Sequence, residues 1–159
     1  MKKILTILFI GALFSACTPG GEKDAADTKK VETEENDIPK MPDLPPVPEG
    51  ASVYFANLED GATVQSPLYV EFGVEGMEIE PAGPINEGKG HHHVVINEGF
   101  TEPGVIVPAD DTHIHYGGGQ TSDTLNLPSG THTLTLQFAD GIHRSYGEQL
   151  SSSIEITVE

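Results

Sequence analysis

Histidine is concentrated in one part of this chain, and its spacing suggests metal chemistry. All seven histidines fall between residues 91 and 143 of a 159-residue sequence. Five of them form a triplet and an H-x-H pair, in the stretches GHHHVV and THIHYGGG. Imidazole nitrogen suits zinc, copper and nickel, whereas calcium and magnesium prefer oxygen ligands. The histidine-rich stretch is therefore the first candidate for a functional site.

Strand alternation selects four of these histidines. Successive side chains of a strand point to opposite faces, so His91 and His93 share one face of their strand. His113 and His115 share a face in the same way, and both pairs point away from neighbouring apolar side chains. We expect both pairs to face outward. Facing Cβ atoms of adjacent strands lie about 4.5–5.5 Å apart, so neighbouring strands would bring the four imidazoles to one ion.

The remaining ligand types narrow the choice of metal. The sequence after residue 50 contains no cysteine and one methionine, Met77, which argues against blue-copper and copper(I) sites. Copper(II) and zinc remain as candidates. The residues expected around the ligands, as a further oxygen ligand or as orienting partners, are Asp110, Asp111, Gln120 and His143.

The other histidines and the enzyme classes have simpler interpretations. His92 and His132 lie on the apolar faces of their strands, where we expect hydrogen-bonded core residues. The four selected histidines could instead form a polar network that holds loops, or bind a small ligand. No serine stands in a G-x-S-x-G turn. A histidine-bound metal with an open position could support hydrolysis or superoxide chemistry, but we expect binding rather than catalysis.

The elements that position these residues read as short strands. Runs with alternating apolar residues are separated by Gly, Pro, Asn and Asp, and no helical periodicity of useful length appears. Seven or eight such strands predict an all-β fold, an immunoglobulin-like or else a cupredoxin-like β-sandwich, over residues 51–159. The expected strands are 52–57, 62–65, 68–74, 91–97, 112–116, 125–127, 132–138 and 152–158.

The N-terminal third predicts export and a lipid anchor. Residues 1–16 have two lysines, an apolar run and small residues before Cys17, as in a bacterial lipoprotein signal peptide. Cys17 is then the lipidated N-terminus, and Thr18 after it favours the outer membrane. Residues 17–50 are acidic and then proline-rich, without aromatic residues, which predicts a disordered linker. The alternative is an ordinary cleaved signal with an incidental cysteine.

Charge limits the partners of the domain. The net charge is −17, and residues 50–159 contain sixteen acidic residues against two basic ones. Such a surface repels phosphate backbones, so nucleic-acid binding is excluded, and it attracts cations. A single cysteine also excludes an intramolecular disulfide.

Several motifs together resemble a bacterial exported family known as domain of unknown function 4399. The resemblance covers nearly all of 52–158 and rests on stretches including FANL, DGATV, FGVEGM, GHHH, PAD, HIHYGGGQT and LPSGTHTL. Near residues 140–145 the family pattern contains more histidine and proline, and only His143 matches. We assign His143 to the surroundings of the site rather than to its ligands. The resemblance implies the extent of the domain and no activity.

The sequence thus predicts a cell-envelope lipoprotein, membrane-associated through its lipid and facing the periplasm or the cell surface. Its β-sandwich would bind copper, zinc or a small ligand through His91, His93, His113 and His115. The alternative is a structural or interaction module of the envelope whose histidines make internal hydrogen bonds. A metal-dependent enzyme is the third interpretation.

Overall fold

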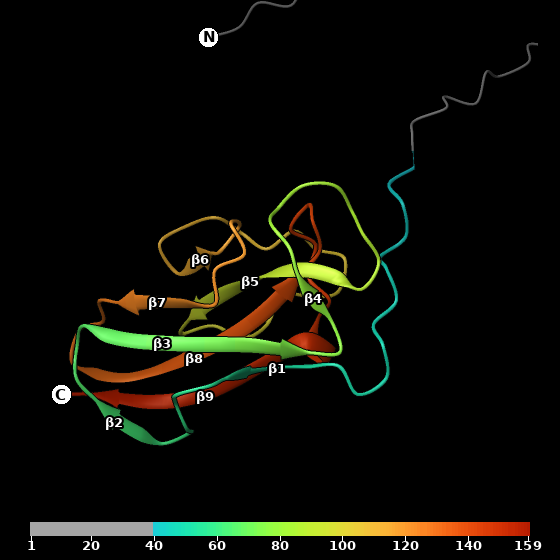
Figure 1. Ribbon diagram of the computed structural model, residues 1–159. Coiled ribbons are helices and arrows are strands. Elements are labelled where there is room, and N and C mark those ends of the chain that lie inside the picture. Colours follow the sequence, from blue (N-terminus) through green and yellow to red (C-terminus); the bar gives the residue numbers. More distant parts are fainter. Residues whose placement is uncertain (1–39) are drawn as a thin grey trace, which may run out of the picture. The chain divides into compact units, whose positions relative to one another are not determined.

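Two β-sheets lie face to face across a single apolar core (Figure 1). The smaller sheet has the order β1–β3–β7, formed by Ser52–Phe55, Leu68–Glu75 and Ser122–Leu125. The larger sheet has the order β2–β9–β8–β5–β4, with β6 paired beside β5. Its strands are β2 (Ala62–Val64), β4 (Glu78–Ile79), β5 (Lys89–Ile96), β6 (His113–His115), β8 (Gly130–Ala139) and β9 (Ser151–Val158). A short 3-10 helix, η1 (Glu148–Leu150), precedes β9.

This computed structural model describes residues 40–159, which form one unit with its own core. The signal peptide at 1–16, Cys17 and the first part of the predicted linker lie outside the described residues. Within residues 40–159, no helix is both long enough and apolar enough to cross a membrane.

Alternation builds the core between the sheets. Val70 and Phe72 of β3 point inward while Tyr69 and Glu71 are exposed, and both belong to one core cluster with Leu134, Leu136 and Phe138 of β8. Fully burying one such side chain stabilises the fold by about 1.5–3 kcal/mol, so this two-layer contact is the main source of stability. The predicted β-sandwich is confirmed.

The structure has nine strands in the described residues, where seven or eight were expected. The two-residue strand β4 was missed because it is too short to show alternation. Strand β7 was expected at 125–127 but occupies Ser122–Leu125, where polar residues hide the pattern. It forms because β3 offers an edge, and Leu68 pairs with Leu125 there.

The larger sheet is also covered on its outer face, the side that carries His91, His93 and Gln137 and points away from the core. Thr135 Oγ1 donates to the Glu98 carbonyl at 2.9 Å, and Gln137 Nε2 donates to the Gly147 carbonyl at 3.2 Å. A loop spanning 97–112 and a hairpin spanning 139–147 therefore lie over this face. The two cover segments pair with each other through a bridge between Ile106 and Arg144.

Residues 40–50, expected to be linker, lie against the domain. Leu44 and Val47 pack on the core, and Arg144 Nη1 donates to the Pro42 carbonyl at 2.6 Å. The compact unit therefore begins at Lys40, before the boundary at 50 read from the sequence.

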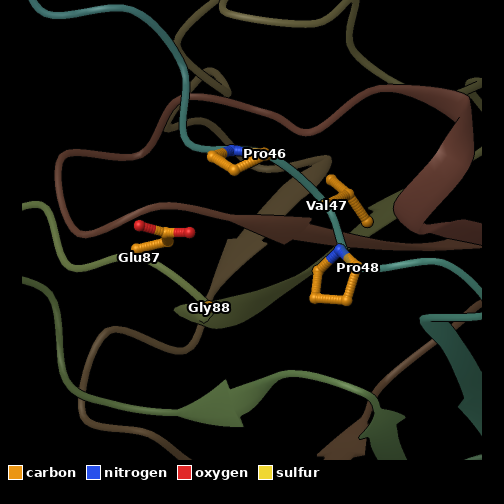
Figure 2. A pocket seen from close by; sticks show the side chains of 5 residues that line it. All are labelled: Pro46, Val47, Pro48, Glu87 and Gly88. Carbon is orange, nitrogen blue, oxygen red and sulfur yellow. The ribbon is translucent and has the colours of Figure 1, made fainter.

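A pocket of about 400 Å³ opens beside this N-terminal segment, between the prolines and the turn before β5 (Figure 2). No histidine lines it: its residues are Pro46, Val47, Pro48, Glu87 and Gly88. The clustered histidines lie elsewhere, on the outer face of the larger sheet.

Candidate metal centre

The two histidine motifs lie on neighbouring strands. β6 pairs antiparallel with β5, and His115 stands directly opposite His93. The pairing occurs because β8 takes one edge of the long buried strand β5. On the other edge β4 pairs only with Lys89 and Gly90, which leaves the rest for the H-I-H segment. The predicted site requires the two histidine strands to be adjacent, and this register shows that they are.

Three imidazoles converge on one point. His91 Nε2 lies 3.2 Å from His93 Nε2 and 3.2 Å from His115 Nε2. One ring nitrogen from each of these three residues lies within 4.8 Å of the others. Two ligands of a tetrahedral zinc ion, at about 2.0–2.1 Å from the metal, lie about 3.3–3.4 Å apart. The observed spacing is close to this value.

A fourth imidazole comes from the hairpin that covers the outer face. His143 Nε2 lies 3.1 Å from His115 Nε2, and its ring centroid lies 5.0 Å from that of His91. The sequence assigned His143 to the surroundings, and its contact with the cluster was not foreseen. The sequence offers only a weak indication of this contact. An Asp-Gly turn follows the longest strand, and His143 lies at the end of that turn.

Hydrogen bonding alone cannot satisfy this cluster. A neutral imidazole nitrogen carries either one N–H or one lone pair in the ring plane. The Nε2 atoms form a chain of three contacts, from His93 to His91 to His115 to His143, so only two of the three can be good hydrogen bonds. In the remaining contact, neither nitrogen has an N–H or a lone pair left to share with the other. A cation between the rings would accept all of the lone pairs.

The environment keeps these rings uncharged. Burial, followed by the neighbouring imidazoles, lowers the pKa of His91 to about 4 and that of His93 to about 2. Burial also lowers the pKa of His115, with His143 as the second cause. His91 and His93 of β5 are fully buried under the cover segments, whereas His115 is exposed. His91 and His93 face away from the core, as the sequence predicted, but the cover segments shield them from solvent. At neutral pH the ring nitrogens retain the lone pairs that bind a metal.

The outer ring nitrogens of β5 lack the support that metal ligands usually have. Within residues 40–159, His91 Nδ1 and His93 Nδ1 are buried and have no hydrogen-bond partner. Metal-bound histidines normally donate this N–H to a carboxylate or carbonyl, and losing that partner costs about 10–100-fold in affinity. The cluster fits a transition metal by its Nε2 geometry, with weaker orientation than a fully supported site.

His113 lies on the same strand but makes different contacts. Its Nδ1 donates to Asp110 Oδ1 at 2.7 Å, and Thr112 Oγ1 donates to the same oxygen at 2.9 Å. These hydrogen bonds lower the pKa of Asp110 to about 2, so that its carboxylate stays ionised. The structure brings together His91, His93 and His115 of the four predicted ligands, and it pairs His113 with Asp110 instead.

The other two residues expected around the ligands lie apart from them. Asp111 is exposed on the loop before β6, and Gln120 Oε1 accepts from the Gly118 backbone N–H at 2.8 Å. Gln120 therefore supports the glycine turn rather than an imidazole.

His92 and His132 occupy the core positions expected of them. His92 is fully buried between Phe72 and Phe138, with both ring centroids 5.0 Å away, and within residues 40–159 neither of its nitrogens has a partner. His132 Nε2 donates to the Pro128 carbonyl at 2.9 Å, and its Nδ1 lies 3.2 Å from Asn97 Nδ2. The expectation of a hydrogen bond holds for His132 and fails for His92.

The glycines after β6 make room for the cluster. A methyl group at Gly117 would overlap the His115 ring, and Gly119 has a positive φ of 79°. Glycine at 117 thus allows the chain to turn directly beneath the His115 imidazole.

The fold and the cluster define a β-sandwich domain with four clustered histidines, three from one sheet and one from a covering hairpin. Residues 70–159 match the family described as Domain of unknown function (DUF4399). Because this match covers more than half of the chain, the protein belongs to that family, as the sequence motifs indicated. No curated protein and no solved structure showed a significant match.

Proposed function

We propose that this protein is a cell-envelope lipoprotein whose β-sandwich binds a transition metal ion through His91, His93 and His115. The observation that supports this most directly is the convergence of three uncharged imidazoles, with Nε2 atoms 3.2 Å apart along the cluster. Square-planar ligands at about 2.0 Å would lie about 2.8 Å apart, and tetrahedral ligands about 3.3 Å. The spacing favours zinc, with copper(II) as the second metal.

The charge of the domain supports the same function. Its sixteen acidic residues against two basic ones produce a field that concentrates cations at the surface. His115 is exposed, and a cation can therefore reach the cluster from solvent at this ligand.

Metal titration tests the proposal. The purified protein is first freed of metal with a chelator and then titrated with zinc or copper(II) by calorimetry. We expect one ion per chain, and loss of more than about 100-fold in affinity for His115→Ala, which removes a ligand outright. His115 is exposed, so its replacement should leave the fold intact.

His113→Asn is the matched control, because it changes a histidine two residues away on the same strand. We expect it to bind zinc like the unmodified protein. Equal weak binding by the unmodified protein and His115→Ala would refute the metal site.

The lipid anchor has a separate test. Cys17 follows a signal-like segment, and its replacement by serine removes the thiol that would carry the lipid. We expect the unmodified protein to partition with membranes and to incorporate labelled palmitate, and Cys17→Ser to do neither. Equal membrane association of both forms would contradict the anchor, and fractionation of inner and outer membranes then tests the outer-membrane assignment.

A further inference from the structure

The segment that carries His143 is a tight hairpin with an unusual residue at its last position. The Asp140 backbone N–H donates to the Arg144 carbonyl, and the His143 N–H donates to the Asp140 carbonyl, both at 2.9 Å. Gly141, Ile142 and His143 thus form a three-residue loop. In such loops the last residue adopts the left-handed conformation that glycine prefers. His143 occupies it with φ of 72°.

Glycine adopts this conformation more readily than histidine does. Within residues 40–159, the non-glycine residues with positive φ are Asn97 and His143. Such residues are uncommon, although asparagine, aspartate and histidine occur there more often than the other types. Strained residues persist where the surroundings enforce them and where the side chain has a function. At this position glycine would serve the turn better, so the imidazole itself needs an explanation.

The imidazole is directed at the metal cluster. The His143 ring centroid lies 4.6 Å from that of His115, 5.0 Å from His91 and 6.0 Å from His93. All ligands of one ion at about 2.0–2.1 Å lie within about 4.2 Å of one another, so a small shift toward His93 would place His143 in the same shell. Its side chain is partly exposed, which leaves space for a rotation of the ring.

The hairpin around His143 is held firmly at its base. Asp140 Oδ1 accepts the backbone N–H groups of Ile142 and Arg144, at 3.1 and 2.9 Å. Asp140 Oδ2 accepts from Arg144 Nε at 2.7 Å. The backbone of the loop is therefore fixed, and the shift required of His143 falls on its side chain.

We propose that His143 is the fourth ligand of the metal ion and closes the coordination shell formed by His91, His93 and His115. This inference rests on the proposed metal-binding function and refines it. Zinc sites with four protein ligands hold the ion without chemistry, whereas catalytic sites keep one position for water. A four-histidine site thus makes this protein a metal-holding protein rather than a hydrolase.

Replacement of His143 by glycine isolates the ligand role, because glycine keeps the backbone conformation and removes only the imidazole. We expect the metal-free His143→Gly protein to melt at the same temperature as the unmodified protein or higher. Its zinc affinity should fall at least about 10-fold, and water should take the open position. Ile142→Gly is the matched control in the same loop, and it should bind zinc like the unmodified protein.

Cobalt(II) substitution reports directly on the open position. We expect azide to change the visible cobalt spectrum of His143→Gly and to leave that of the unmodified protein unchanged. If both proteins bind cobalt with equal affinity and respond to azide alike, His143 is not a ligand and the three-histidine site stands. If the unmodified protein binds neither zinc nor cobalt, the proposed function itself fails and His143 has no ion to close over.

Discussion

Replacing Arg144 by methionine is expected to lower the free energy of unfolding by about 3–5 kcal/mol, the usual cost of leaving one buried charge without its partner. Asp140 is fully buried and Arg144 is 3% exposed. Arg144 Nε donates to Asp140 Oδ2 at 2.7 Å, and Nη1 donates to the Pro42 carbonyl at 2.6 Å. Methionine has similar length and removes these donors. Denaturant unfolding followed by circular dichroism measures the change, since the chain has no tryptophan.

The double variant Arg144→Met/Asp140→Asn separates the lost pairing from lost packing. Asparagine can still accept the two backbone N–H groups of the hairpin, and it leaves no charge behind. We expect the double variant to be more stable than Arg144→Met alone. A loss below about 1 kcal/mol in the single variant would match an exposed pair and contradict the structure.

Acid is expected to destabilise the metal-free protein well above the pH at which carboxylates titrate. Burial, followed by His91, lowers the pKa of His92 to about 4, and burial likewise lowers the pKa of His91 to about 4. In the unfolded chain a histidine titrates near its usual value of 6.5. Below pH 6.5 these histidines bind protons in the unfolded chain, whereas in the folded protein they stay neutral until the pH approaches 4. The stability contribution is complete above about pH 6.5 and is lost as the pH falls toward 4.

Each buried histidine ring contributes a large part of this loss in the free energy of unfolding. One pH unit between those limits costs about 1.4 kcal/mol per histidine, so His92 alone removes about 3 kcal/mol by pH 4. Unfolding by denaturant in the presence of chelator, at pH 7.5, 6.0 and 5.0, measures this slope. A stability that stays constant from pH 7.5 to pH 5.0 would contradict the burial of these rings.

His92→Leu is the variant that isolates one histidine from the metal cluster. Leucine is close in volume and removes two buried nitrogens that have no partner within the described residues. We expect equal or higher stability at pH 7.5 and a shallower loss toward pH 5.0, with zinc binding retained because His92 points into the core. A slope identical to that of the unmodified protein would show that His92 does not contribute.

The sequence predicts the parts of the site that depend on neighbouring residues, and it misses those that depend on residues far apart in the chain. Alternation is local, so the shared face of His91 and His93 could be read from the sequence, as could the core position of His132. The partnership of His113 with Asp110 is also local, but it competes with metal ligation, and the sequence does not rank the two. The sequence could not assign His143 to the ligands, because its position depends on a hairpin that folds back over β5. His143 lies 46 residues after Asn97, the residue that follows β5.

The fold shows the same division. The long strands β3, β8 and β9 have apolar alternation and β5 has a Val-Val-Ile run, and all four were predicted within a few residues. The covering of the outer face was not predicted, because the 97–112 loop has no periodicity and is held by hydrogen bonds to residues such as Thr135 and Ser145. The contacts of residues 42–47 with the domain were not predicted either. These residues resemble a linker in the sequence, but Arg144 donates hydrogen bonds to the carbonyls of Pro42 and Asp43.

The hydrogen bonds from Arg144 to Pro42 and Asp43 also have a mechanical consequence. Within residues 40–159, these two carbonyls lie near the N-terminal end of the described chain and are held by Arg144. Any tension between the membrane and the domain is therefore transmitted to Arg144, which is the residue next to His143. If Cys17 carries a lipid as proposed, a pull on the tether would act on the hairpin that carries His143.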